Sequence, residues 1–582
     1  NEMKRCPICR RDYYDETLLY CLDDGAALVD GPGKDSPAHS ARPGAAFDDE
    51  PRTALLGSSS APSEAPTRQQ VNPGSPGVPD PSHPVSKDHD RSRRKAAIAL
   101  VAGLVALAAI GAAAYSFYSR DESTQIQSIA VMPFLNESGN PDVEYLSDGM
   151  ADSLINSLSQ LPKLKVKARS YVFRYKGKDV LPQTVGSELN VQAILNGRIV
   201  QRGENLTLYL SLVDALSGDQ IWGENYDRKM GDLVSLQTEI ARDVSRKLGA
   251  RLSGADERML TTPYTANPEA YQNYLRGRYH TMYVTRPELL KAIPYFQKAI
   301  EIDPKYALAY VGLADAYRGL PLAGEMSPQE YFPKAKTAAL RAIEIDDKLA
   351  EAHAVLGWII YWWDWDFAEA EKHCRRAVEL DPNSSDGQMA YAHVLSSLGR
   401  HDEAITRART AREIEPLNVR TNTLEAQFLI HAGKPDEALD RLRQVLDLDP
   451  NYWFAYQFLA SAYIDKGLYA EAIEAGKKGM EVYPTNTRNA SFVACAKAKL
   501  GHASEARSML AKMLEPAEGK YVPPFNIALV HNCLDDKDQT FTWLQKGIEQ
   551  RDPRMTFLKS EPKWNNLRDD PRFQELLKRV GF

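Results

Sequence analysis

Cysteine is scarce in this chain, and the short motifs of common enzyme classes are missing. Six cysteines among 582 residues exclude a small scaffold built from disulfides. The chain also lacks the GxxxxGKS/T and GxGxxG phosphate-binding loops, the HExxH and GxSxG motifs, and the HRD and DFG kinase signatures. These absences predict a protein that is not an enzyme.

A strong excess of either charge is missing as well. The 71 lysines and arginines nearly balance the 78 aspartates and glutamates, so the net charge is −7. A broad basic surface is the usual electrostatic footprint of a nucleic-acid-binding protein. We therefore expect no nucleic acid on the main body of the protein.

Residues 31–95 have almost no aromatic side chains, since Phe47 is the only one. The same stretch contains 11 prolines and many serines and glycines. Such a composition cannot bury enough apolar surface to offset the entropy lost on folding. The stretch is therefore predicted to be a disordered tether rich in Pro, Ser and Gly.

Residues 96–118 contain no charged side chain. As a helix they would be about 34 Å long, which exceeds the ~30 Å hydrocarbon core of a membrane, so we expect one transmembrane helix rather than a buried core helix. Four basic residues lie at positions 91–95. The positive-inside rule then places residues 1–95 in the cytoplasm and residues 119–582 in the periplasm or another extracytoplasmic space, with the helix in the inner (cytoplasmic) membrane.

Two further sequence features concern the oligomeric state of the protein and the compartment that contains residues 119–582. Ala99 and Gly103 form one small-xxx-small pair, which is compatible with a homodimer of this helix. Cys374, Cys495 and Cys533 are odd in number, so at least one thiol stays free, which argues mildly against an oxidising compartment.

The first 30 residues carry a metal-ligand pattern. Cys6 and Cys9 form a C-x2-C turn, and Cys21 precedes Asp24 with the same spacing. Two such turns joined by a hairpin suit a tetrahedral structural zinc, although an aspartate is an unusual fourth ligand. The alternative is three free thiols on a disordered tail. The CPxC turn, the later cysteine and the Asp-Gly pair resemble short zinc-ribbon modules of bacterial membrane-signalling proteins.

Residues 126–253 alternate between strand and helix patterns. Leu206, Leu208, Leu210 and Leu212 occupy every second position, which is typical of a strand with one buried face. We expect one sheet with helices packed against it. The expected strands are 128–134, 164–168, 193–200, 206–214 and 220–226, and the expected helices are 145–161 and 233–248.

The same region contains four motifs in a fixed order: IAVMPF, Asp148-Gly149, Gly186-x2-Leu189-x-Val191-x3-Leu195-x-Gly197 and Gly218-x3-Trp222-x3-Tyr226-Asp227-Arg228. They resemble the TolB-type amino-terminal (FlgO-like) domain of bacterial envelope proteins. The resemblance implies an interaction or sensory domain without enzymatic activity. Judged from the residues alone, the glycines are turn residues with positive φ, and Trp222 anchors the core.

Small residues recur every 34 positions in the C-terminal half, at Ala392, Ala426, Ala460, Ala494 and Ala528. A second series of the same period runs Ala404, Ala438, Ala472, Ala506 and Thr540, and prolines close the units. A 34-residue period with these features is the tetratricopeptide pattern. About eight repeats are expected over residues 267–553, with residues 554–582 as a capping segment over the exposed end.

Stacked helical hairpins present a concave groove lined mainly by their first helices. The predicted lining is polar with an aromatic cluster, which suits a bound peptide or protein segment. Alternatively, Trp362, Trp363 and Trp365 pack the turn between two helices, and His393 and His431 are plain surface histidines. The predicted partner contacts are Trp358, Tyr361, Trp362, His393, Gln427 and His431.

The sequence therefore predicts a multidomain chain: a small zinc ribbon, one transmembrane helix, an α/β sheet domain and an all-α tetratricopeptide superhelix. We expect a membrane-anchored scaffold or sensor that recruits protein partners. One alternative is a signal transmitter whose cytoplasmic zinc module contacts a kinase, a regulator or nucleic acid. The other is an enzyme in the α/β domain that uses Asp148, Lys178 or Arg228.

Overall fold

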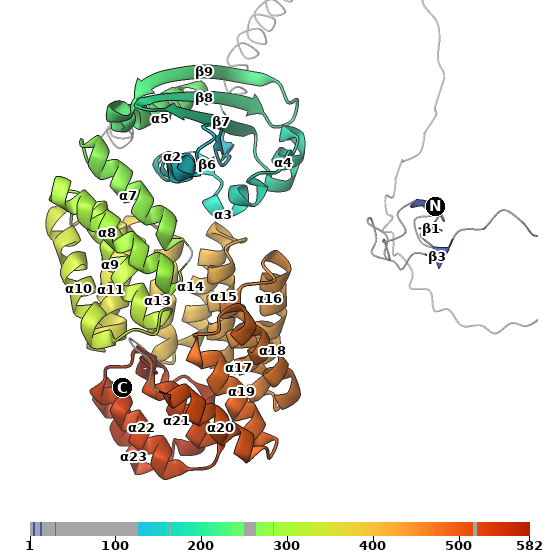
Figure 1. Ribbon diagram of the computed structural model, residues 1–582, viewed down its shortest axis with the longest axis vertical. Helices are drawn as coiled ribbons and strands as arrows, with labels where there is room; N and C mark the ends of the chain where they lie inside the picture. Colours follow the sequence, from blue (N-terminus) through green and yellow to red (C-terminus); the bar gives the residue numbers. More distant parts are fainter. Residues whose placement is uncertain are drawn as a thin grey trace, which may run out of the picture. The chain divides into compact units, whose positions relative to one another are not determined.

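The chain forms two compact units, Asn1–Ala97 and Ile98–Phe582. In the second unit, a sheet domain is followed by paired helices (Figure 1). The computed structural model describes residues 126–159, 161, 164–249, 264–282, 284–515 and 521–582, together with three short strands near the N-terminus.

The described part of the first unit is a small antiparallel sheet. β1 (Lys4–Arg5) lies in the middle and pairs with β2 (Asp12–Tyr13) and β3 (Val29–Asp30). The predicted zinc ligands Cys6, Cys9, Cys21 and Asp24 lie outside the described residues, as do the predicted tether and membrane span. None of the helices that the structure describes combines the length and apolar character that crossing a membrane requires.

The sheet of the second unit has the strand order β6-β4-β7-β8-β9, and β5 also pairs with β7. β4 runs parallel to β6 and β7, whereas β7, β8 and β9 are antiparallel. The four alternating leucines of β8 are all buried, as their spacing predicts. The strands are β4 (Ser128–Val131), β5 (Leu135–Asn136), β6 (Lys165–Val166), β7 (Ala193–Arg202), β8 (Asn205–Asp214) and β9 (Gln220–Lys229).

Two amphipathic helices supply most of the apolar surface that packs on this sheet. α2 (Glu144–Ser159) buries Leu146, Met150 and Leu154, and α5 (Leu233–Lys247) buries Leu236 and Ile240, among others. Both sets recur at helical spacing and join the core that the sheet contributes to. The shorter helices of the domain are η1 (Pro141–Val143), α3 (Arg169–Val172), η2 (Phe173–Tyr175), α4 (Pro182–Leu189) and η3 (Met230–Asp232).

The glycines of this domain correct one expectation. Of the glycines in the four sequence motifs, only Gly218 is a turn residue with positive φ (81°). Gly186 lies in α4 and Gly197 in β7, and both are required by close packing instead. A Cβ on Gly197 would lie 2.3 Å from the Phe134 ring, and one on Gly186 would lie 2.5 Å from Ala215.

Replacing Gly197 by alanine is therefore expected to lower the free energy of unfolding by about 1–3 kcal/mol, because the buried Phe134 ring must move. Thermal unfolding of the purified chain would measure the loss. Gly231→Ala is the matched control, since nothing lies within 4 Å of its added Cβ. Equal midpoints for the two variants would contradict the packing argument.

The sheet domain and the first repeat share one core. Tyr271 on α7 (Pro268–Thr281) donates a hydrogen bond to Ser153 on α2, with 2.8 Å between the oxygens. Arg278 lies 3.4 Å from Asp152 of the same helix. Tyr306 at the start of the next hairpin is buried in the sheet domain's apolar cluster. The domain is thus packed directly on the repeats.

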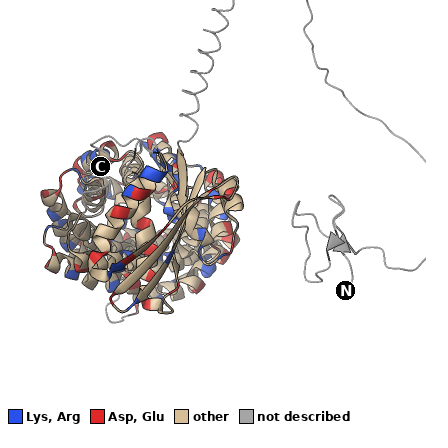
Figure 2. Ribbon diagram, turned by 90° about the horizontal axis from the view of Figure 1, so that it is seen from above, with Lys and Arg blue, Asp and Glu red and all other residues tan. Residues whose placement is uncertain are grey.

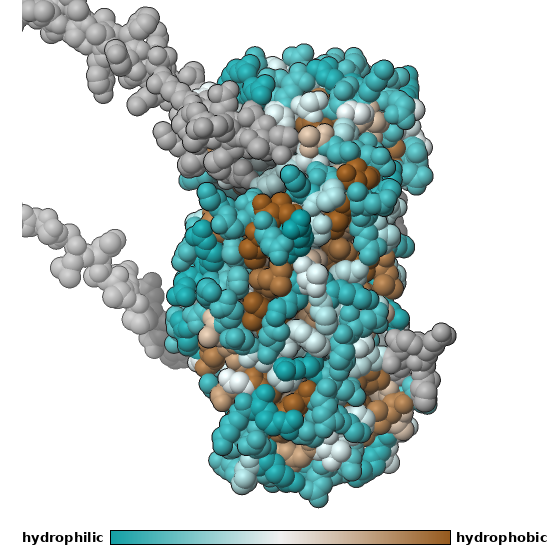
Figure 3. Space-filling view, turned by 90° about the vertical axis from the view of Figure 1, so that its left-hand side faces the viewer, coloured by the Kyte–Doolittle hydropathy of each residue, from teal (hydrophilic) through white to brown (hydrophobic). Residues whose placement is uncertain are grey.

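Eight helix pairs follow among the described residues (Figure 1). The small residues that recur every 34 positions are fully buried where neighbouring helices approach each other. On the face in Figure 3, hydrophilic residues surround separate apolar patches. The pairs are α7 with α8 (Arg286–Ile302), α9 (Ala307–Leu322) with α10 (Pro328–Ile345), α11 (Ala350–Ile359) with α12 (Phe367–Leu380), α13 (Ser385–Ser397) with α14 (His401–Ile414), α15 (Val419–His431) with α16 (Pro435–Leu448), α17 (Trp453–Asp465) with α18 (Tyr469–Val482), α19 (Thr487–Lys499) with α20 (Ala503–Leu514), and α21 (Pro524–Cys533) with α22 (Lys537–Glu549).

Candidate functional site

The predicted partner contacts lie in α11, the π-helical turn η4 (Ile360–Asp364), α13 and α15, and several of them touch. The rings of Trp358 and Trp362 stack with centroids 6.1 Å apart, and His393 lies 4.4 Å from Trp358. The Tyr361 hydroxyl is 2.6 Å from Ser397 Oγ. All six residues are less than a tenth exposed, so they do not form the open lining that the sequence suggested.

The residues that cover them belong to the chain itself. We call residues 551–567, which contain η5 (Pro553–Phe557) and η6 (Pro562–Leu567), the closing segment. Its Phe557 ring packs edge-on against Trp362, with centroids 5.3 Å apart, and lies 5.2 Å from His431. An internal segment therefore occupies the place predicted for a partner.

The tryptophans after α11 pack within the fold. Trp363 stacks on Phe332 of α10, with centroids 5.8 Å apart. The Arg551 guanidinium of the closing segment lies 4.4 Å from the Trp365 ring. Trp362 contacts Phe557, so the alternative in which these rings are packing residues describes the structure.

The histidine expectation is wrong. His393 and His431 are buried rather than on the surface, and burial lowers their pKa to about 3 and about 4. His393 Nδ1 lies 3.1 Å from the Met389 carbonyl, and His431 Nδ1 lies 3.1 Å from Ser396 Oγ. Both rings are therefore neutral near pH 7.

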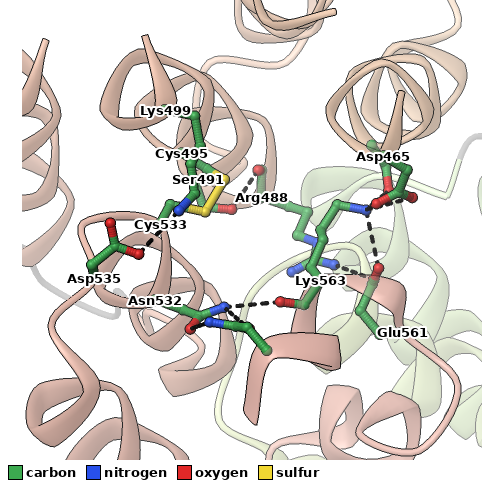
Figure 4. The surroundings of a disulfide bond; sticks show 12 residues. Asp465, Arg488, Ser491, Cys495, Lys499, Asn532, Cys533, Asp535, Glu561 and Lys563 are labelled. Carbon is green, nitrogen blue, oxygen red and sulfur yellow. Dashed lines mark hydrogen bonds and ion pairs between the residues drawn. A yellow bond between two sulfur atoms is a disulfide. The ribbon is translucent and has the colours of Figure 1, made fainter. Parts of the chain in front are cut away.

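A buried ion network anchors the closing segment (Figure 4). The side chain of Lys563 is 3% exposed, and its Nζ lies 3.0 Å from carboxylate oxygens of both Asp465 and Glu561. The same ammonium donates to Ser461 Oγ at 2.7 Å. Burial opposes ionisation of Glu561, but the attraction of Lys563 holds the pKa of that carboxyl below its usual range. Arg488 adds a contact of 3.4 Å to Glu561.

A second set of contacts joins early and late repeats. Glu325, between α9 and α10, accepts hydrogen bonds from the backbone N–H of Thr487 at 3.0 Å and from its hydroxyl at 2.9 Å. Arg554 donates to the Leu322 carbonyl at 3.2 Å, and Tyr483 donates to the Ala323 carbonyl at 3.2 Å. Repeats 160 or more residues apart in sequence therefore meet around the closing segment.

The cysteines of the repeats divide into a bridge and a free thiol. Cys495 of α19 and Cys533 of α21 form a disulfide (Figure 4). Cys374 is free and buried, and burial raises the pKa of its thiol. The prediction of at least one free thiol is confirmed, but two of the three sulfurs are paired.

The end of the repeats is also covered. α23 (Pro571–Val580) contacts α22, and the Phe582 ring stacks on Phe367 of α12, with centroids 4.6 Å apart. The C-terminal residues thus pack on the last helix and on an early repeat.

The sheet domain carries a hollow of about 660 Å³ outside the repeats. It lies between the loop after η2 and strands β7 to β9, and Lys178, Arg198, Tyr209 and Asn225 are among its lining residues. Arg198 lies 3.3 Å from Glu137, so this cation is paired. The hollow offers polar and aromatic groups but no assembled catalytic set.

The residues named for an enzyme are not brought together. Asp148 on α2 pairs with Lys176, whose Nζ lies 2.7 Å from Oδ1, and burial raises the pKa of Asp148 against the attraction of that lysine. Arg228 pairs with Glu239 on α5 at 2.8 Å. Lys178 lines the hollow on the sheet instead.

Two observations on the described parts of the chain concern metal ligands and the distribution of charge. No group of three or more His, Cys, Asp or Glu residues there could hold a metal ion. Acidic and basic residues are interspersed along the helices in Figure 2. The proposed zinc ligands near the N-terminus lie outside these parts.

Family models match separate stretches of the chain. Residues 124–242 match the model described as HilA/YgeH-like transcriptional regulator, second domain. Tetratricopeptide repeat models match residues 288–306 and 429–494. The model of anaphase-promoting complex, cyclosome, subunit 3 matches residues 365–445.

Curated proteins resemble parts of the chain. A protein named putative adenylate cyclase 3, from Rhizobium meliloti strain 1021, is 29% identical over 236 residues, which is 40% of each chain. The transcriptional regulator HilA of Salmonella typhimurium is 26% identical over 132 residues, or 23% of this chain and 24% of HilA. The chain thus spans about two fifths and about a quarter of these relatives.

Solved structures share the helical-repeat architecture at low similarity. YrrB, described as a TPR protein with an unusual peptide-binding site, is 22% identical, with a TM-score of 0.23 over 33% of this chain and 95% of its own. The human IFIT1 dimer is 15% identical, with a TM-score of 0.36 over 60% of this chain and 87% of its own. Together with the 34-residue period and the helix pairs, the repeat models establish that the C-terminal part of the chain contains tetratricopeptide repeats.

Proposed function

We propose that the protein is a membrane-anchored, non-catalytic scaffold that binds protein partners through its repeats, with a TolB-like sheet domain packed on them. The observation that carries this proposal is the closing segment. The groove holds a stretch of polypeptide with two short 3-10 helices through aromatic contacts and a buried lysine, and a peptide partner could use the same contacts. A partner would bind by exchanging with this segment.

Photo-crosslinking in cells tests this proposal. A photoreactive residue at Lys559, which is exposed on the closing segment, would report what approaches the groove, and one at the exposed Glu301 of α8 is the control. We expect discrete adducts with other proteins from position 559, and more of them when Lys563→Met weakens the closing segment. Only adducts within the chain, in both versions, would contradict a scaffold that binds through the groove.

The membrane anchor, the zinc module and the topology belong to the same proposal. The disulfide between Cys495 and Cys533 supports a location of residues 119–582 outside the cytoplasm, because disulfides persist in oxidising compartments. Structural zinc on Cys6, Cys9, Cys21 and Asp24 would fold the cytoplasmic module.

Protease added to spheroplasts should cleave the large fragment, and alkylation in cells should leave Cys495 and Cys533 unmodified. A protected fragment with both thiols alkylated would place the repeats in the cytosol.

The second candidate is a signal transmitter. It is favoured by the partial relatives, one named a transcriptional regulator and the other a putative adenylate cyclase. In this view the sheet domain and repeats form the receiving part, and the N-terminal module contacts a cytoplasmic regulator. Capture of a defined cytoplasmic protein by the full chain, lost when Cys6 and Cys9 are changed to serine, would favour it.

A further inference from the structure

β9 forms a long edge of the sheet. It pairs with β8 on one side, and no other strand among the described residues pairs with it. The opposite edge, β6, spans only Lys165–Val166. β9 contains no proline, and most of its side chains are exposed. Edge strands of this length usually pair with another chain or carry devices that prevent pairing.

The backbone of β9 presents free donors along this edge. The Met230 N–H donates to the Glu204 carbonyl at 2.9 Å, which fixes the alternation of the antiparallel ladder. Trp222, Glu224, Tyr226 and Arg228 therefore bond to β8, and the N–H groups of Gly223, Asn225 and Asp227 point away from it. In the described chain these three donors have no acceptor.

We propose that two copies of this chain pair through their β9 strands, antiparallel and centred on Asn225. Each of the three outward N–H groups then meets a carbonyl of the other copy: Asn225 faces Asn225, and Gly223 faces Asp227. This inference is independent of the proposed groove function, because it uses another surface.

Charge and geometry select the register. Centred on Asn225, Glu224 lies opposite Tyr226 and Trp222 lies opposite Arg228, so no like charges face each other. A ladder centred on Glu224 would oppose two carboxylates.

A ladder centred on Tyr226 would also avoid like charges. It would place Gly223 opposite Lys229, however, whose N–H already donates to Asp232 at 3.3 Å, so that pair would lose a hydrogen bond. In the Asn225 register Lys229 lies opposite Ile221, outside the three central pairs. The Asn225 register therefore leaves the most complete ladder.

Cross-linking of the full chain tests the register. In Asn225→Cys, we expect oxidation to give a covalent dimer whose linked peptide joins residue 225 to residue 225. Leu216→Cys is the matched control, because Leu216 is 90% exposed in the turn before β9 but lies outside the ladder. No more linked dimer from position 225 than from position 216 would overturn the proposal, and the unsubstituted chain gives the background of its native cysteines.

Hydrogen exchange provides a second readout that other dimer contacts do not affect. The outward N–H groups of β9 should exchange at least about tenfold more slowly than free strand amides, and Asn225→Lys should remove this protection while Leu216→Lys keeps it. Fast exchange of these amides in the unsubstituted chain would overturn the proposal. Fast exchange would instead mean that the edge is unpaired and that the charges of Glu224 and Asp227 prevent another strand from pairing with it.

Discussion

Replacing Lys563 by methionine is expected to lower the free energy of unfolding by about 3–5 kcal/mol and to release the closing segment. Methionine keeps much of the aliphatic length but leaves Asp465 and Glu561 without the ammonium that lies 3.0 Å from each. Removal of one partner from a buried ion pair costs more than the pair contributes, since the remaining charge stays out of water. Ser461 loses its donor as well.

Limited proteolysis and hydrogen exchange of residues 551–567 would measure this release, and thermal unfolding would measure the stability. Lys559→Met is the matched control, because Lys559 lies in the same segment but is exposed. We expect the control to change stability by no more than about 0.5 kcal/mol. Slow exchange of the segment in Lys563→Met would show that aromatic packing by Phe557 and Trp564 holds it without the ion network.

The repeats and the sheet domain could be predicted because their signals are local. A period of 34 residues places Ala392 and Ala426 at the same contact between helices, and both are fully buried. The leucines of β8 occupy every second position, and this alternation likewise predicts that they form the buried face of the strand. Each of these patterns requires only the geometry of one helix pair or one strand.

The state of the groove could not be predicted, because it depends on contacts between distant residues. Lys563 is 98 residues from Asp465, and Glu325 is 162 residues from Thr487. Repeat spacing placed Trp362 and His431 on the inner side of the superhelix but could not show that another segment covers them. One local signal existed, since the closing segment contains four apolar residues that are fully buried, Met555, Leu558, Trp564 and Leu567.

The contact between Glu325 and Thr487 is expected to make the stability of the protein depend on pH. Burial raises the pKa of Glu325 to about 7, compared with 4.5 for an ordinary glutamate. The folded chain therefore binds a proton more tightly than the unfolded chain, so this group's contribution is present below about pH 4.5 and is lost as the pH rises toward 7. A shift of this size corresponds to about 3 kcal/mol.

His393 and His431 have the opposite sign, because burial lowers the pKa of both rings. Unfolding then takes up protons as the pH falls below about 6.5, so stability decreases on the acid side as well. The two effects together predict an optimum between about pH 5 and 7 for the closed repeats. Thermal midpoints between pH 4 and 9 would locate this optimum.

The Glu325→Gln variant measures how much the Glu325 carboxylate contributes to the pH dependence of stability. A glutamine oxygen can still accept from Thr487 but carries no charge, so the variant should keep its stability between about pH 4.5 and 7, where the unsubstituted chain loses the contribution of Glu325. Glu301→Gln is the control, since Glu301 is exposed on α8 and should leave the curve unchanged. If Glu325→Gln lost stability between about pH 4.5 and 7 in the same way as the unsubstituted chain, another buried acid would be responsible. Asp465 is the first to test, because burial raises its pKa to about 6. If Glu325→Gln instead removed the loss of stability between about pH 4.5 and 7, ionisation of this one residue between two repeats would loosen the contacts around the closing segment.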